Sequence, residues 1–377
     1  MKELLAPFYQ VIENRHSWIE EYKKRTWAKV AGYFCDYTPE EFLWAAGFTT
    51  VRITGGRGLV GEADKHLQSN VCSFARRCFD QALTGVYDYL DAIIIPHTCD
   101  VITKMYDLWA YRMKKPDFLH YVWTPHKVFD KAAVSVFEGE LKRLKESLEG
   151  FIGYEIKDEA LAGAISLYDK SRTLLKKVYE LRRSEPPILS GTDALAVALS
   201  SMLAPKDIHN EWMETLLGGT AELQKSSLGK RPRVLVSASV LDDLELVKAT
   251  EDAGMWVVAD DICTGSRYFW DIVGESVSNP VKALTLRYLN KLPCPRSVGS
   301  LQRRNDHIFN LVNDYKVNGV IFYILRCCDA HLFQYPLLNE RLQSKGIKTL
   351  YIQGEQTVGV NESVANRLSA FGEILSS

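Results

Sequence analysis

Residues 89–100, YLDAIIIPHTCD, and residues 318–329, NGVIFYILRCCD, are two short segments that end in the same dipeptide, Cys-Asp. Each is a nearly continuous apolar run, which is the pattern of a strand buried on both faces of a parallel sheet. A helix is expected to begin directly after each Cys-Asp. The two segments therefore predict an α/β fold in which similar strands occur twice.

A longer unit is also repeated along the chain. Residues 30–54 have the pattern strand, helix, strand, and residues 234–259 have the same pattern in the same order. Both helices are expected to stop at Ala-Gly, which is Ala46-Gly47 in one and Ala253-Gly254 in the other, because glycine readily ends a helix. The simplest account is an internal duplication that gives two related Rossmann-like domains, each a doubly wound and mostly parallel sheet.

The domain boundaries follow from this repeat. We predict an N-terminal α/β domain over residues 1–126, a helical connecting region over 127–230 and a C-terminal α/β domain over 231–377. The connecting region is rich in Leu, Lys, Glu and Arg at helical spacing and is broken at Glu185-Pro186-Pro187. The chain is predicted to close with a strand and a helix capped by Asn361, over residues 349–353 and 361–375.

The overall composition excludes some classes of partner and location. A formal net charge of -1 gives no electrostatic reason to expect nucleic acid or an anionic membrane as a partner. No run approaches the ~20 apolar residues that span a bilayer, and the N-terminus lacks the apolar core of a signal peptide. A cytoplasmic location is therefore expected.

The expected cytoplasmic location affects how the eight cysteines are interpreted. In a reducing compartment, clustered cysteines indicate metal binding or catalysis rather than disulfides. The plain alternative is that cysteine serves as a small apolar residue of the core, and this is the role expected of Cys78. The sequence contains no Cys-x-x-Cys pair, so it supports neither a zinc ribbon nor a thioredoxin-like motif.

Cys99 and Cys328 follow the two related strands, where ligands of open α/β sheets usually lie. Both are expected to face one cleft between the halves, and the helix that follows each is expected to favour its thiolate form. The adjacent Asp100 and Asp329 are expected to cap these helices. Cys72, at another predicted helix start, is the best candidate for a third thiolate.

Other polar residues lie near the same sheet edges. His97 and Glu355 are weak candidates for catalytic groups, and His97 is more readily explained as a packed or hydrogen-bonded side chain. Asp260-Asp261 ends a predicted strand and is expected to cap the next helix. These residues do not by themselves define a reaction.

Six segments, taken together and in this order, resemble the 2-hydroxyacyl-CoA dehydratase and benzoyl-CoA reductase subunit family, with the double-cubane cluster proteins as close kin. The resemblance covers nearly the whole chain. The segments that carry it are Phe34–Glu41, Ala45–Gly47, Asn70–Ser73, His97–Asp100, Asp260–Phe269 and Arg326–Asp329.

The resemblance implies a low-potential [4Fe–4S] cluster held by Cys72, Cys99 and Cys328. It also implies a homologous second subunit, in a heterodimer or heterotetramer, and an ATP-dependent activator protein that delivers single electrons. The implied substrate is a CoA thioester. One-electron reduction of the thioester gives a ketyl radical that expels a hydroxyl group in the dehydratases, and the same electron transfer dearomatises a benzoyl ring in the reductases.

The chain departs from many dehydratase subunits in having further cysteines. Cys35, Cys263 and Cys294 form a second set that is more similar to the double-cubane proteins, so a homodimeric reductase of small molecules with an [8Fe–9S] cluster is an alternative. A non-catalytic subunit that carries electrons is another. Cys327 stands beside Cys328, and the choice between them as ligand is open, although the Asp that follows favours Cys328.

Overall fold

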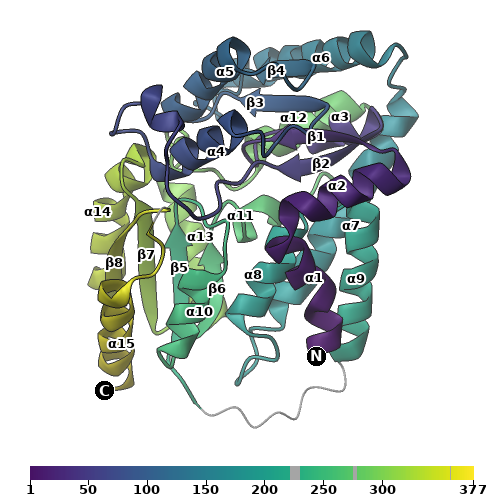
Figure 1. Cartoon of the computed structure of the whole chain (residues 1–377). Helices are drawn as coiled ribbons and strands as arrows, with labels where there is room; N and C mark the ends of the chain where they lie inside the picture. The colour runs from purple at the N-terminus through teal and green to yellow at the C-terminus, as the bar shows by residue number, and fades with distance from the viewer. Residues whose placement is uncertain (221–229, 275–277, 357) are drawn as a thin grey trace.

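The computed structural model describes residues 1–220, 230–274, 278–356 and 358–377, and its architecture is α/β (Figure 1). It contains two four-stranded, all-parallel sheets with the strand orders β2-β1-β3-β4 and β6-β5-β7-β8. The strands of the first sheet are β1 (Lys29–Tyr33), β2 (Phe48–Arg52), β3 (Ala92–Pro96) and β4 (Phe118–Val122). Those of the second are β5 (Arg233–Ala238), β6 (Trp256–Asp261), β7 (Gly319–Leu325) and β8 (Lys348–Gly354).

The shared strand order bears out the predicted repeat. In each half the first strand is central, the second pairs on one side of it, and the chain then crosses to the other side for the third and fourth. The order therefore reverses between β1 and β3 and between β5 and β7. Such reversal points are where open α/β sheets bind ligands, beyond the carboxyl ends of the strands.

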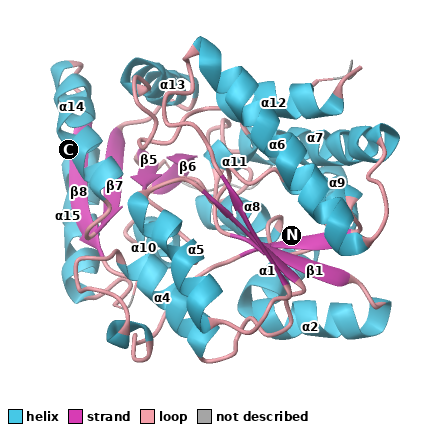
Figure 2. Ribbon diagram, turned by 90° about the horizontal axis from the view of Figure 1, so that it is seen from above, coloured by secondary structure: helices cyan, strands magenta, loops and turns pink. Residues whose placement is uncertain are grey.

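Helices cover both faces of both sheets, as Figure 2 shows from above. In the first half they are α1 (Lys2–Glu13), α2 (Arg15–Thr26), α3 (Glu40–Ala45), α4 (Ser73–Leu83) and α5 (Asp100–Arg112). The middle of the chain supplies α6 (Lys131–Ile152), α7 (Asp158–Glu180), α8 (Gly191–Ser200) and α9 (Lys206–Gly219). The second half supplies α10 (Glu245–Asp252), α11 (Ser266–Phe269), α12 (Pro280–Asn290), α13 (Leu301–Asp314), α14 (Asp329–Ser344) and α15 (Glu362–Ser376). None of the helices in these described ranges is long and apolar enough to cross a bilayer.

The core follows from the alternation of side chains along each strand. In β3, Ile93 and Ile95 pack into one apolar cluster with residues of α4 and α5, while Ala92 and Ile94 pack into another with α6 and α12. All four side chains are fully buried. A strand that is buried on both faces needs apolar residues at every position, so its sequence is a continuous apolar run. For this reason the sequence of β3 predicts a parallel sheet that is covered on both faces.

The connecting region does not form a layer of its own. Helix α6 packs against β4 of the first sheet, whereas α8 packs against β6 of the second. The predicted break at Glu185-Pro186-Pro187 falls between α7 and α8. The end of the predicted region, 221–229, lies outside the described residues, and the domain boundaries stay predictions.

Both predicted Ala-Gly helix ends are present. Ala46 and Ala253 are the C-caps of α3 and α10, and Gly47 and Gly254 follow with φ of 85° each, in the left-handed region that glycine adopts without strain. Helix α10 begins at Glu245. Before it, the carboxylate of Asp242 accepts a hydrogen bond from the backbone N–H of Gly56, at 2.9 Å, across the two halves.

Helix α15 begins as predicted, with Asn361 as its N-cap. The Oδ1 atom of Asn361 accepts a hydrogen bond of 3.0 Å from the backbone N–H of Val364. Replacing Asn361 with Ala is expected to lower the free energy of unfolding by about 1 kcal/mol, because this N–H loses its partner. Urea unfolding measures the change, and Ser369→Ala on the exposed side of the same helix is the control. An Asn361→Ala chain as stable as the control would contradict the capping role.

Candidate functional site

Three cysteines occupy the same position relative to three helices. Cys72, Cys99 and Cys328 are the N-cap residues of α4, α5 and α14. The expectation that Asp100 and Asp329 cap these helices is therefore wrong. Each Asp is the first helical residue, where its charge is favourable near the positive end of the helix dipole, and the preceding cysteine has the non-helical backbone of the cap.

The surroundings of the three sulfur atoms are also alike. In each case the backbone N–H of the third helical residue lowers the pKa of the thiol; these residues are Ala75, Ile102 and His331. The side chain of Ser239, which follows β5, lowers the pKa of Cys328 further. Backbone N–H groups at a helix start are a fixed source of positive potential.

Burial nevertheless dominates the ionisation of these thiols. It raises the pKa of Cys72 and Cys99, and it raises that of Cys328 to about 12. Cys99 has exposed surface, but the protein atoms packed around its sulfur still disfavour the thiolate. The expectation that the helix starts favour the thiolate is thus wrong for the net pKa of the free chain. Binding of a metal deprotonates such thiols, because the positive charge it brings outweighs desolvation.

The structure brings the three thiols together from both halves. After burial, the charges of Cys99 and Cys328 raise the pKa of Cys72, and so does the charge of Cys327. Cys99 lies beyond β3 of the first sheet and Cys328 beyond β7 of the second, so the carboxyl ends of the two sheets meet here. Residues far apart in sequence form one group of thiols.

The second set of cysteines adjoins the first. After burial and the charge of Asp36, the charges of Cys263 and Cys294 raise the pKa of the half-buried Cys35 thiol. After burial, the charge of Cys294 also raises the pKa of Cys99 and Cys328. Cys263 Sγ accepts a hydrogen bond of 3.2 Å from the guanidinium of Arg52. Cys294 is therefore near members of both sets, and the six cysteines form one neighbourhood.

In the described part of the chain, no three His, Cys, Asp or Glu side chains gather closely enough to bind a single metal ion. The thiolate ligands of an iron–sulfur cubane each bind a different iron atom, so they stand further apart than the ligands of one ion. A donor set composed of thiols at three helix starts fits such a cluster.

A buried ionic network lies behind these thiols. Asp261, at the end of β6, accepts from Arg267 at 2.9 Å and from Arg304 at 2.8 Å, and all three side chains are buried. Burial alone would raise the pKa of Asp261, but the two guanidinium groups hold it well below its usual range. Neither Asp is the N-cap of α11, which is Gly265, so the expected capping role is wrong in that sense. The Oδ1 atom of Asp260 nevertheless accepts from the backbone N–H of Ser266, the first residue of α11, at 2.8 Å.

Two further residues position the thiols, and neither was predicted from the sequence. Ser239 Oγ accepts from the backbone N–H of Leu325 at 3.0 Å in addition to its effect on Cys328. The backbone N–H of Gln356 donates to Ser73 Oγ at 2.9 Å, which fixes the start of α4 beside Cys72. Ser239 follows a central strand and could have been found by the rule that located Cys99, whereas no sequence pattern marks Gln356.

His97 and Glu355 lie at the carboxyl edges of their sheets, as expected. His97 Nδ1 is 3.2 Å from the carbonyl oxygen of Thr124, and its ring stacks on Trp123 with centroids 5.8 Å apart. Glu355 is half-buried beyond β8 and lines a small pocket that contains no cysteine. Cys78 is fully buried in the apolar core, as predicted.

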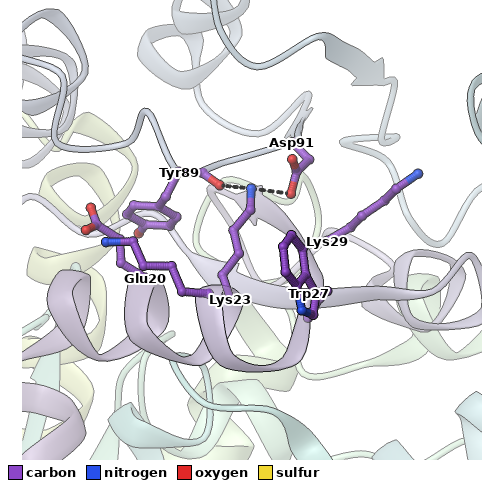
Figure 3. A pocket seen from close by; sticks show the side chains of 8 residues that line it. Glu20, Lys23, Trp27, Lys29, Tyr89 and Asp91 are labelled. Carbon is purple, nitrogen blue, oxygen red and sulfur yellow. Dashed lines mark hydrogen bonds and ion pairs between the residues drawn. The ribbon is translucent and has the colours of Figure 1, made fainter.

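A pocket of about 460 Å³ lies at the opposite, amino ends of β1 and β3 (Figure 3). Lys23 Nζ donates there to the backbone carbonyl of Tyr89 at 2.6 Å and to Asp91 at 2.7 Å. The lining residues are Glu20, Lys23, Lys24, Trp27, Ala28, Lys29, Tyr89 and Asp91. The pocket contains no thiol and belongs to the edge of the sheet away from the cysteines.

Similarity to known proteins extends along almost the entire chain. The chain is 26% identical over 369 residues to the (R)-phenyllactyl-CoA dehydratase beta subunit of Clostridium sporogenes, covering 98% of this chain and 97% of the relative. It is 26% identical to a benzoyl-CoA reductase subunit of Thauera aromatica, covering 92% and 90%. It is 27% identical to the (R)-2-hydroxyglutaryl-CoA dehydratase beta subunit of Acidaminococcus fermentans, covering 99% of both.

A family model described as 2-hydroxyglutaryl-CoA dehydratase, D-component, matches residues 35–375. The match begins at Cys35 and includes every other cysteine of the site. Because the match covers most of the chain, the chain belongs to the 2-hydroxyglutaryl-CoA dehydratase D-component family.

Proposed function

We propose that this chain is the iron–sulfur subunit of a CoA-thioester dehydratase or of an aryl-CoA reductase of the benzoyl-CoA type. The observation that carries the proposal is the gathering of thiols from both halves at the joined carboxyl ends of the two sheets. Cys72, Cys99 and Cys328 are the proposed ligands of a [4Fe–4S] cluster. Their identical positions at helix starts favour Cys328 over Cys327, which has the left-handed φ of 63°.

When bound, the cluster supplies single electrons of low potential to a thioester. The residues of this chain hold it and shape its surroundings. Helices α4, α5 and α14 fix the three sulfur atoms, and Ser239 and Gln356 fix two of the loops that carry them. The partial burial of the thiols limits access of water and oxygen to the metal.

The proposed partners follow from the relatives, two of which are named as beta subunits of dehydratases and one as a subunit of benzoyl-CoA reductase. We propose a homologous second subunit, a separate ATP-dependent protein that delivers electrons, and a CoA-thioester substrate. The cytoplasm, which keeps thiols reduced, suits such a site. The residues of the site do not select between an aliphatic and an aromatic acyl group.

A second candidate is favoured by the position of Cys294. Because Cys294 adjoins both Cys99 and Cys35, the six thiols form one group that suits an [8Fe–9S] double cubane. In this alternative the chain is a homodimeric reductase of small molecules. One observation goes against a metal-binding role for Cys263. Its sulfur atom accepts a hydrogen bond from Arg52, and a guanidinium can stabilise a thiolate without any metal.

Iron and acid-labile sulfide per chain decide between these candidates. After anaerobic purification and reconstitution, we expect about four irons per chain for a single cubane and about eight for a double cubane. Loss of water from a 2-hydroxyacyl-CoA, or reduction of an aryl-CoA, is then measured with and without the second subunit and the activator. A chain that takes up no iron would overturn both candidates, and full activity without a second subunit would exclude the first.

A further inference from the structure

One arginine near the thiols has no partner for its charge. The three guanidinium nitrogens of Arg296 are shielded from solvent, and none of them has a hydrogen-bond partner. Of the arginines in the described ranges, Arg296 is the only one with all three nitrogens in this condition. A buried cation without a partner is costly, so its retention indicates a missing anionic partner.

The buried arginines of the described residues show what such a partner usually is. Six of the eight donate to a carboxylate or to a cysteine: Arg52 to Cys263, Arg77 to Asp80, Arg172 to Glu41 and Asp169, Arg182 to Asp260, and Arg267 and Arg304 to Asp261. The other two, Arg233 and Arg287, donate to backbone carbonyls. No carboxylate of the described residues forms an ion pair with Arg296. The described protein atoms therefore supply no hydrogen-bond or ion-pair partner to the guanidinium of Arg296.

The surroundings of Arg296 indicate where that partner lies. Its guanidinium lies over the ring of Tyr37, 4.1 Å from the centroid. After burial and the charge of His126, the charge of Arg296 also lowers the pKa of His97, which places it near that ring. Tyr37, His97 and Arg296 itself are each two residues from a cysteine, namely Cys35, Cys99 and Cys294. Arg296 is thus enclosed by the three loops that carry these thiols.

We propose that Arg296 is the counter-charge of the iron–sulfur cluster and stabilises its reduced form; this inference rests on the proposed function. Uptake of one electron from the activator adds one unit of negative charge to a group already bound by thiolates. A cation held close by, in surroundings of low dielectric constant, lowers the free energy of that state. Its N–H groups can also donate to cluster sulfur atoms, which is a known control of reduction potential.

A substrate anion is the competing partner. The burial of all three nitrogens argues against it, because an anion that arrives from solution has no open path to them. The proposed cluster, in contrast, would be inserted among the same loops before the activator reduces it. The two partners also predict different effects of replacing Arg296. If the partner is the cluster, the midpoint potential changes in the absence of substrate. If the partner is a substrate anion, only KM changes.

The test is a redox titration of the reconstituted full chain, followed by electron paramagnetic resonance without substrate. For Arg296→Gln we expect full iron content and at least a tenfold lower ratio of reduced to oxidised cluster at a fixed potential, which is a 59 mV more negative midpoint for one electron. Arg296→Lys keeps the charge but loses the planar set of donors, so a smaller decrease is expected.

Arg326→Gln is the matched control, since Arg326 adjoins Cys327 but is exposed, and solvent screens its charge. An unchanged midpoint in Arg296→Gln with iron bound would overturn the role of Arg296 and leave the proposed function intact. If Arg296→Gln does not fold, the apolar and uncharged Arg296→Met is titrated in its place, and an unchanged midpoint there has the same meaning. A wild-type chain without iron would overturn both.

Discussion

Replacing Cys72, Cys99 or Cys328 with Ser, one at a time, is expected to remove most of the iron from the anaerobically purified chain. Activity with the second subunit and activator should fall by about a thousandfold or more, because the barrier to a one-electron step cannot be lowered without the electron donor in place. A serine hydroxyl is a far weaker ligand for iron than a thiolate. Iron and sulfide analysis and the visible absorption of the cluster measure the loss.

The chain offers a control on the same helix as Cys72. Cys78 is fully buried in the apolar core and is not a proposed ligand, so Cys78→Ala is expected to cost some stability but to keep full iron. Cys327→Ser is expected to keep most of its iron, and the reverse result would move the third ligand from Cys328 to Cys327. Full iron in the variants of Cys72, Cys99 and Cys328 would show that these residues are not the ligands.

Replacing Asp261 with Asn is expected to lower the free energy of unfolding by about 3–5 kcal/mol. The amide has nearly the shape of the carboxylate, so packing is preserved while Arg267 and Arg304 lose their shared negative partner. Two buried guanidinium groups then repel each other without compensation. The decrease is measured by urea unfolding of the iron-free chain.

The effect of Asp261 should depend on pH in a defined direction. Its folded-state pKa lies well below the usual value, so its contribution is fully present above about pH 4 and is lost as pH falls from there toward the folded-state pKa. The difference between wild type and Asp261→Asn should therefore shrink below about pH 4. Asp252→Asn, which removes the exposed pair with Lys248, is expected to cost less than about 1 kcal/mol. Equal losses in the two variants would contradict the network.

Local sequence patterns predicted most of the fold. The apolar runs before Cys99 and Cys328 correctly located β3 and β7, because strands covered on both faces admit few polar residues. The turn after α3 was predictable at Gly47, since only glycine enters the left-handed region without strain. Helix starts were less predictable: a cysteine with an extended backbone, and not the Asp after it, is the cap of α5.

The candidate site was only partly predictable, because much of it is made by contacts between distant segments. Gln356 donates to Ser73 across 283 positions of sequence, and Arg52 donates to Cys263 across 211. These contacts depend on how the two sheets are placed against each other, which no local pattern encodes. The isolation of Arg296 was equally invisible, since it depends on which carboxylates are absent from its surroundings.

The contribution of thiols by both halves has a consequence for biosynthesis. Cys99 leaves the ribosome about 230 residues before Cys328, which is an interval of roughly 10 to 50 seconds at ordinary bacterial rates of synthesis. A nascent chain in this interval has only two of the three proposed ligands in reach. If Cys72, Cys99 and Cys328 are the ligands, a complete three-thiolate site can therefore form only after 328 of the 377 residues have been made.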